Sequence, residues 1–134
     1  MIKYQTNLDD ITSDLLDGFF VDWPNPPNQK TFFKLLKKSY KIVLAKDNER
    51  VVGFISAISD GVLSAYIPLL EVLPEYQKQG IGKILMQMMI EQLKDLYMVD
   101  LLCDQELISY YEKIGMTKSY GAMLRNYDKQ SGTR

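Results

Sequence analysis

Residues 77–83, with the sequence Gln-Lys-Gln-Gly-Ile-Gly-Lys, have the types and spacing that suit the binding of phosphate oxygens. They lie between a predicted strand that ends at Val72 and a predicted helix over residues 81–96. The backbone N–H groups in the first turn of a helix have no intrahelical partner, and the positive end of the helix dipole faces the same way. Gly80 and Gly82 let this backbone approach a ligand with no Cβ in the way. The run therefore predicts a site for a phosphate-bearing cofactor.

Two better-known phosphate loops do not fit this run. A Walker A loop needs glycine at position 77 and serine or threonine at position 84, where the chain has Gln77 and Ile84. A dinucleotide fingerprint that begins at Gly80 needs glycine or alanine at position 85, which is Leu85. The run is therefore neither a nucleoside-triphosphate loop nor a dinucleotide-binding loop.

Composition limits which partners and which catalytic groups the protein can use. The chain has 134 residues, of which 46% are hydrophobic and 25% charged, and its net charge is −1. We therefore expect one globular domain over residues 1–127 with a polar tail over residues 128–134, and neither nucleic acid nor membrane as a partner. The only cysteine is Cys103 and histidine is absent, which favours a reducing, cytoplasmic location and excludes Ser-His-Asp chemistry. We expect no metal, and a carboxylate, tyrosine, lysine, cysteine or water as the general acid or base.

Hydrophobic periodicity and turn residues predict the elements that position this site. The fold class is α/β (α+β), with a mixed, mostly antiparallel central sheet flanked by helices in the order β-α-α-β-β-β-α-β-α-β-β. The predicted strands cover residues 1–6, 40–45, 51–59, 62–72, 99–103, 116–120 and 122–127, and the predicted helices cover residues 8–16, 29–39, 81–96 and 105–113. Asn7 is the expected N-cap of the first helix, and Gly115 is the expected end of the last.

Two sequence blocks carry a resemblance to a known family. The Gln-x-x-Gly-x-Gly string at residues 77–82 resembles motif A of the GNAT superfamily, the acetyl-CoA-dependent N-acetyltransferases. About 30 residues later, Tyr-Tyr-Glu-Lys-Ile-Gly-Met at residues 110–116 is similar to the family's Phe-Tyr-Glu-Lys-x-Gly-Phe, on the expected element. The resemblance covers roughly residues 51–127, whereas the first 40 residues match only in the order of elements.

The resemblance implies how coenzyme A would be held. The pyrophosphate would lie on backbone N–H groups of the motif, and the pantetheine arm would pair with the fourth strand as an added strand does. A β-bulge in that strand would open a slot for the thioester. Asp104 matches an asparagine that contacts pantetheine in the family, although a helix cap is an equally good interpretation. The implied cofactor-binding residues are Leu70, Glu71, Val72, Gln77, Lys78, Gln79, Gly80, Ile81, Gly82, Lys83, Asp104 and Tyr111.

The resemblance also implies catalytic roles. Tyr111 stands where the family often keeps a tyrosine near the sulfur, and a phenol can supply the proton that the leaving thiolate needs. At the two positions where many members carry a Glu or His base, this chain has Pro68 and Tyr66. Glu71 is the only carboxylate within the strand. Glu71 or Tyr66, through water, could accept the amine proton, or the amine could enter neutral.

The sequence says less about the residues that would bind the acceptor of the acetyl group. Trp23, in a proline-rich loop, is either a packing anchor or a lip over the acceptor, and Asp60 hints at a cationic acceptor. The resulting hypothesis is transfer of an acetyl group from acetyl-CoA to a primary amine of a small molecule or peptide by direct attack. The alternative is a non-catalytic acyl-CoA-binding sensor or interaction module, which the missing family carboxylate favours. Both a monomer and a homodimer remain open.

Overall fold

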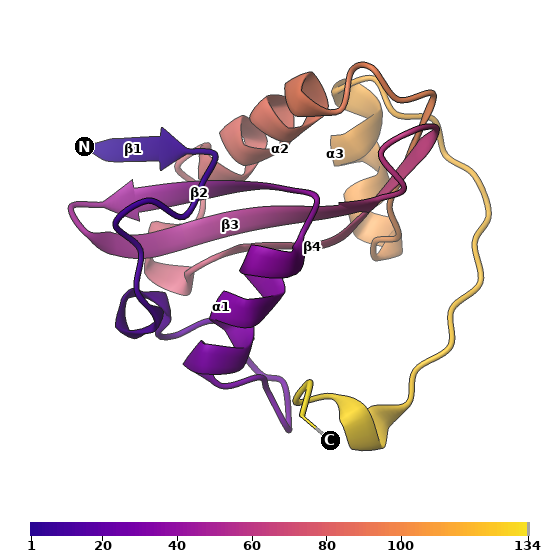
Figure 1. Ribbon diagram of the computed structural model, residues 1–134. Helices are drawn as coiled ribbons and strands as arrows, with labels where there is room; N and C mark the ends of the chain where they lie inside the picture. Colours follow the sequence, from indigo (N-terminus) through magenta and orange to yellow (C-terminus); the bar gives the residue numbers. More distant parts are fainter. Residues whose placement is uncertain (134) are drawn as a thin grey trace.

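The structure is a computed structural model that describes residues 1–133 (Figure 1). One sheet has the strand order β1-β2-β3-β4-β5, antiparallel throughout except for the parallel pair β4–β5. The strands are β1 (Ile2–Gln5), β2 (Lys41–Asp47), β3 (Arg50–Ser59), β4 (Ser64–Val72) and β5 (Met98–Asp100). The α-helices are α1 (Gln29–Lys38), α2 (Ile81–Gln92) and α3 (Ile108–Lys113), and the 3₁₀ turns are η1 (Ser13–Leu16), η2 (Pro74–Tyr76), η3 (Gln105–Leu107) and η4 (Tyr127–Lys129).

The two longer helices cover opposite faces of the sheet (Figure 1). On one face α2 packs closely on β3. A Cβ at Gly53 in β3 would lie only 3.2 Å from the Leu85 side chain in α2. On the other face the ring of Phe32 in α1 meets that of Phe54 in β3, with centroids 4.6 Å apart. Gly53 and Phe54 are neighbours on β3, and successive strand residues point to opposite faces. The predicted mixed, mostly antiparallel sheet between helices is therefore confirmed.

The predicted helix over residues 8–16 is wrong, since only the short turn η1 forms there. The side chain of Asn7 does not cap a helix. It accepts the N–H of Asp9 at 3.0 Å, and Asp10 takes a left-handed φ of 61°. Asparagine and aspartate stabilise such local turns in competition with a helix, which explains the difference.

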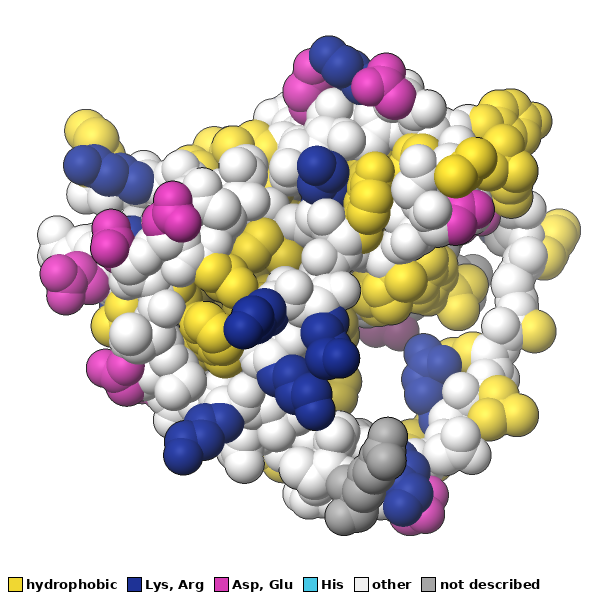
Figure 2. Space-filling view, in the orientation of Figure 1, with side chains coloured by type: hydrophobic (Ala, Val, Ile, Leu, Met, Phe, Trp, Pro, Cys, Tyr) yellow, Lys and Arg dark blue, Asp and Glu magenta, His cyan; other side chains and the backbone are white. Residues whose placement is uncertain are grey.

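The two predicted C-terminal strands, residues 116–120 and 122–127, are also wrong. Residues 117–126, called the C-terminal arm below, instead run extended and stand away from the body (Figures 1 and 2). Within residues 1–133, none of the ten arm N–H groups donates to a backbone acceptor. Strand β5 correspondingly ends at Asp100, three residues before its predicted end. A strand persists only where a neighbour pairs with it, and neither segment has that neighbour here.

Smaller differences occur at helix ends. Helix α2 ends at Gln92 rather than at residue 96, and the predicted helix 105–113 divides into η3 and α3. The predicted tail begins in η4, and Arg134 lies outside the described residues. Among the described helices, none combines the length and apolar character that crossing a membrane requires.

Candidate active site

The turn between β4 and α2 adopts a conformation that glycine makes accessible. Lys78 and Gly80 have left-handed φ values of 63° and 82°, and Gly80 is the N-cap of α2. A Cβ at Gly80 would meet no atom within 4 Å, so glycine is favoured here by its φ and not by crowding. The sequence therefore places a glycine where the backbone must reverse into the helix.

Six consecutive N–H groups, those of residues 78–83, have no acceptor within the described chain. The first bond of the helix runs from the Ile84 N–H to the Gly80 carbonyl at 3.2 Å. A Cβ at Gly82 would meet only Val72 Cγ2, at 3.9 Å, so packing does not require glycine at that position. Free donors at the positive end of a helix, with unfilled space beside them, fit the pyrophosphate of a cofactor.

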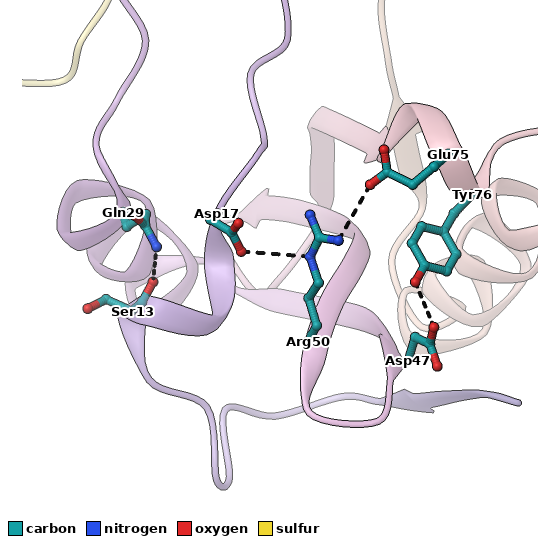
Figure 3. A network of polar contacts seen from close by, with 7 residues as sticks. All are labelled: Ser13, Asp17, Gln29, Asp47, Arg50, Glu75 and Tyr76. Atoms are coloured by element: carbon teal, nitrogen blue, oxygen red, sulfur yellow. Dashed lines mark hydrogen bonds and ion pairs between the residues drawn. The ribbon is translucent and has the colours of Figure 1, made fainter.

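Polar contacts fix the segment that leads into this turn (Figure 3). The Tyr76 hydroxyl donates to Asp47 Oδ2 at 2.6 Å, and this bond, more than burial, raises the pKa of the phenol. Arg50 lies between Glu75 at 3.6 Å and Asp17 at 3.7 Å. These contacts tie η2 to the β2–β3 hairpin and to η1, which holds the donors of residues 78–83 in place relative to the sheet.

Strand β4 contains the bulge that the resemblance implies. Two β4 residues, Ile67 and Pro68, stand opposite the single β3 residue Ala57. Proline has no N–H to give to a ladder, so a bulge is one of the few places within a sheet that accepts it. The bulge is thus consistent with the local sequence as well as with the family.

Beyond the bulge, β4 leaves its parallel neighbour. The two strands pair only between Ser64–Tyr66 and Met98–Asp100. On the side away from β3, residues 67–72, called the open edge below, therefore have no strand beside them among the described residues. The Leu73 N–H donates to the Val52 carbonyl on β3 at 2.9 Å. Because N–H directions alternate along a strand, those of Leu70 and Val72 point to the open edge.

One side chain already crosses from the turn to this edge. The amide of Gln77 donates to the Val72 carbonyl at 3.0 Å. The first residue of the motif therefore joins the end of β4 to the donors at the start of α2. This side chain thus connects the open edge with the six N–H groups of residues 78–83.

The bulge also decides which side chains share a face. Tyr66 pairs with Ile58 and Glu71 pairs with Phe54, and these two β3 residues are four positions apart. Cross-strand partners share a face, so Tyr66 and Glu71 both lie on the face covered by α1. Without the extra residue they would lie on opposite faces.

The carboxylate of Glu71 holds the loop that precedes α1. Its Oε1 accepts the Phe20 N–H at 2.9 Å, and its Oε2 accepts the Val21 N–H at 3.3 Å. Phe20 is buried with a φ of 62°, and its ring lies 4.9 Å from that of Trp23. Trp23 thus packs on the Phe20 ring, and 38% of its surface remains exposed. Sequence reasoning missed this anchoring role because the partners are about 50 residues apart. The role of Glu71 as a base stays a prediction.

Tyr111 lies half-buried on α3. The helix ends in a Schellman motif, in which the Gly115 N–H donates to the Glu112 carbonyl and the Met116 N–H to the Tyr111 carbonyl, both at 3.1 Å. Burial, followed by the proximity of Cys103 and Tyr110, raises the pKa of the Tyr111 phenol above its ordinary value. The phenol therefore keeps its proton at neutral pH. Burial likewise raises the pKa of the Cys103 thiol, which disfavours the thiolate a nucleophile needs.

The other two predicted site carboxylates have different surroundings. Asp60 Oδ1 accepts three N–H groups of the β3–β4 turn, and those of Leu63 and Val62 contribute most to lowering the pKa of its carboxyl. Asp60 therefore stabilises a turn, and a contact with the acceptor stays a prediction. Asp104 precedes η3, but its side chain makes no capping bond. Its contact with pantetheine also stays a prediction.

Comparison with known proteins agrees with this geometry. The model of the Acetyltransferase (GNAT) family matches residues 8–116, and the bulged β4 agrees with what the resemblance to that family implies. The chain belongs to the GNAT family.

Relatives and solved structures support the same assignment. The chain is 33% identical over 103 residues to the uncharacterised N-acetyltransferase ycf52 of Porphyra purpurea, covering 73% of this chain and 59% of the relative. It is 30% identical over 108 residues to histone acetyltransferase TAP1 of Glycine max, covering 71% and 46%. A Deinococcus radiodurans R1 crystal structure, provisionally described as an acetyltransferase, is 42% identical with a TM-score of 0.95, covering 99% of this chain and 94% of that one. The chain thus spans about half the length of the two curated relatives.

Proposed function

We propose that the protein transfers an acetyl group from acetyl-CoA to a primary amine by direct attack, with no covalent enzyme intermediate. The observation that carries this proposal is the pair of backbone sites that Gln77 joins, the open edge of β4 and the six free N–H groups of residues 78–83. The N–H groups of residues 78–83 bind the pyrophosphate, and the backbone of Leu70, Glu71 and Val72 binds the pantetheine arm. Acetyl-CoA supplies the thioester whose carbonyl carbon the amine attacks.

Three residues of the chain act on the reacting atoms in this proposal. The Val72 N–H points to the open edge and polarises the thioester carbonyl. Tyr111 gives its proton to sulfur as the C–S bond breaks, which its retained proton at neutral pH permits. Both oxygens of Glu71 already accept loop N–H groups, so water at Tyr66 receives the proton that the nitrogen loses as the amide forms. An amine that enters neutral loses only this one proton, whereas a charged amine must lose another before it attacks.

The acceptor belongs to the face that carries α1. Trp23 lies there on a loop that Glu71 fixes to β4, and its exposed side is suited to cover an acceptor. A peptide amine and a small-molecule amine are both accommodated by this proposal. The single cysteine and ordinary composition further support a reducing, cytoplasmic location.

A second candidate, a non-catalytic acyl-CoA sensor, is favoured by one observation. Glu71 is the only carboxylate in β4, and it is engaged in anchoring a loop. Thiol release from acetyl-CoA in the presence of a panel of primary amines and peptides separates the two functions. Release above the amine-free rate is expected. Tight binding of acetyl-CoA without any release would establish the sensor instead.

A paired variant tests the cofactor site. Gly82→Leu puts a side chain beside the free donors, and its Cβ would meet only Val72 Cγ2, at 3.9 Å, so the fold is expected to persist while acetyl-CoA affinity falls about 10-fold or more. Gln87→Leu adds the same side chain on an exposed position of α2 and is the control. Affinity is read from the concentration dependence of Tm with acetyl-CoA. Equal affinities in the two variants, or no Tm shift in the parent protein, would contradict the assignment of this site.

A further inference from the structure

Helix α1 presents a row of lysines to solvent. The lysines recur every three to four residues, which places them on one side of the helix, opposite the buried Phe32 and Leu36. Figure 2 shows basic side chains gathered over α1 with no acidic side chain among them. All four lysines of the helix are exposed, and they are called the lysine face below: Lys30, Lys34, Lys37 and Lys38.

The sequence provides no counter-charge close to this face. Residues 23–46 contain six lysines and no aspartate or glutamate, although the whole chain has a net charge of −1. Every ion pair among the described residues involves Arg50 or Lys94, so no member of the lysine face is paired there. A helix face that is only solvated usually mixes both signs of charge, whereas charge of a single sign attracts ligands of the opposite sign.

A cavity of about 360 Å³ continues the lysine face at the C-terminal end of α1. Lys37 of the lysine face and Lys41 both line it, together with hydroxyl and amide side chains such as those of Thr6 and Asn7, and no acidic residue lines it. Ammonium, hydroxyl and amide groups all donate hydrogen bonds, and carboxylates accept them. The cavity therefore suits an acidic side chain.

The spacing of the lysine face fits a row of carboxylates better than one small anion. From Lys30 to Lys38 the helix rises about 12 Å, which is too far for one small anion to contact both ends. Lysines four residues apart are separated by about 6 Å along the axis. Side chains on one face of an extended peptide recur about every 6.7 Å, so acidic residues at alternate positions match the row.

A nucleic acid fits this face less well than an acidic protein does. Proteins that bind single strands stack bases on aromatic side chains, but both aromatic residues of α1 are covered, with Phe32 buried and Phe33 half-buried. The helix also has no arginine, and the net charge of −1 opposes binding to a long polyanion. The chemistry of the face thus favours an acidic segment of a protein.

The lysine face lies next to the proposed acceptor side of the site. The Phe20 ring lies 4.9 Å from the ring of Trp23 and 5.0 Å from that of Phe32 in α1. Trp23, which is suited to cover an acceptor, therefore shares a packing partner with the helix that carries the lysines. A peptide whose amine lies beside Trp23 can continue over α1.

We propose that the lysine face and the adjoining cavity bind an acidic segment of a protein, and that an amine of the same protein is the acceptor. This inference rests on the proposed function, which leaves a peptide amine and a small-molecule amine open. It differs from the cationic acceptor at which Asp60 hints, and Oδ1 of Asp60 already accepts three N–H groups of a turn.

Binding of a labelled peptide to the full chain, followed by fluorescence anisotropy, tests the docking surface without any turnover. The probe alternates glutamate and glycine, with a free N-terminal amine and the label at its C-terminus, and the control peptide has glutamine in place of glutamate. We expect the glutamate peptide to bind about 10-fold or more tightly, by a margin that salt reduces. Equal affinities would overturn the proposal. Tighter binding of an RNA oligonucleotide with the same number of charges would also overturn it.

A double charge reversal tests whether the lysine face is responsible. Lys30→Glu/Lys34→Glu suits the helix, because an acidic residue is favoured in the first turn and a glutamate at position 34 faces Lys38 one turn later. The control Lys3→Glu/Lys118→Glu changes the net charge equally at exposed positions elsewhere. We expect the Kd of the glutamate peptide to rise about 10-fold or more in the first variant alone. Equal changes in both variants would show an effect of net charge only and would overturn the proposal.

Steady-state kinetics with the same peptides separate this inference from the proposed function. Lys30→Glu/Lys34→Glu should raise the KM for the glutamate peptide, with kcat and the KM for acetyl-CoA unchanged. Acetyl transfer to both peptides with equal kcat/KM would overturn the inference and leave the proposed function standing. Charge-dependent binding without any transfer would overturn the acceptor role and leave a docking surface alone.

Discussion

The cofactor end and the acceptor end of the candidate site are built differently. At the cofactor end, residues 78–83 present backbone N–H groups, and one stretch of sequence supplies nearly everything. At the acceptor end, side chains come from distant segments, such as Glu71 on β4 and the loop at Phe20, 51 positions earlier in the chain. Tyr111 comes from a third segment, on α3. A backbone site of the first kind is specified by one short stretch of sequence. A side-chain site of the second kind depends on the tertiary fold.

This difference explains how the ends should respond to substitution. At the acceptor end the groups are side chains, so a substitution removes one of them directly, and at Glu71 it also removes the acceptor of the Phe20 and Val21 N–H groups. At the cofactor end the proposed functional groups are backbone N–H donors, which a substitution cannot remove. A substitution there changes binding by altering the backbone φ or by filling the space beside the donors. Three sets of variants, from the largest expected effect to the smallest, test this contrast.

The largest effect is expected for Tyr111→Phe. The variant keeps the ring that packs on the core and removes the hydroxyl that we propose gives its proton to sulfur, so kcat should fall about 100-fold with the KM for acetyl-CoA unchanged. Because burial raises the pKa of this phenol, kcat of the parent protein should show no tyrosine titration below about pH 10.

Tyr110→Phe is the matched control for that experiment. Its ring packs edge-to-face on Tyr111 with centroids 5.1 Å apart, so it has a similar setting on the same helix. Steady-state kinetics should show little change for Tyr110→Phe. Equal kcat values in the two variants would reduce Tyr111 to a packing residue.

An intermediate effect is expected for Glu71→Ala. The change leaves the buried N–H of Phe20 without its charged acceptor, which should lower the free energy of unfolding by about 2 kcal/mol. Glu75→Ala, which removes only an exposed ion pair to Arg50, should cost no more than about 0.5 kcal/mol in denaturant unfolding.

Kinetics of Glu71→Gln distinguish anchoring from proton transfer. One amide oxygen can still accept the Phe20 N–H, so an anchoring role predicts a raised KM for the acceptor with kcat nearly unchanged. A loss of kcat of about 100-fold or more, with KM unchanged, would identify Glu71 as the base instead.

The smallest effects separate the two glycines. Gly80→Ala places a Cβ on a residue with φ 82°, which should cost about 1 kcal/mol of unfolding free energy. Gly82→Ala lies inside α2 with room for a methyl group, so it should stabilise the protein by about 0.5–1 kcal/mol. Thermal or urea unfolding gives both values. Destabilisation by both changes would show that Gly82 is also constrained by the fold.

The contrast between local and distant determinants also governs what the sequence could predict. The hairpins, the glycine turn and the C-cap at Gly115 follow from nearby residues, and the structure confirms them. The Glu71–Phe20 contact could not be predicted, because no local pattern pairs a strand carboxylate with a distant loop N–H. The two C-terminal strands were predicted wrongly for a related reason. Their residues favour strands, but no strand forms in the protomer without an edge to pair with.

The central claim is that the backbone N–H groups of residues 78–83 hold the pyrophosphate. Amide chemical shifts of the full-length protein, measured by NMR during a titration with coenzyme A, test it most directly. The largest shifts are expected for the free donors of Ile81, Gly82 and Lys83, because they gain charged acceptors. Saturable binding that leaves these amides unchanged and moves others would contradict the claim.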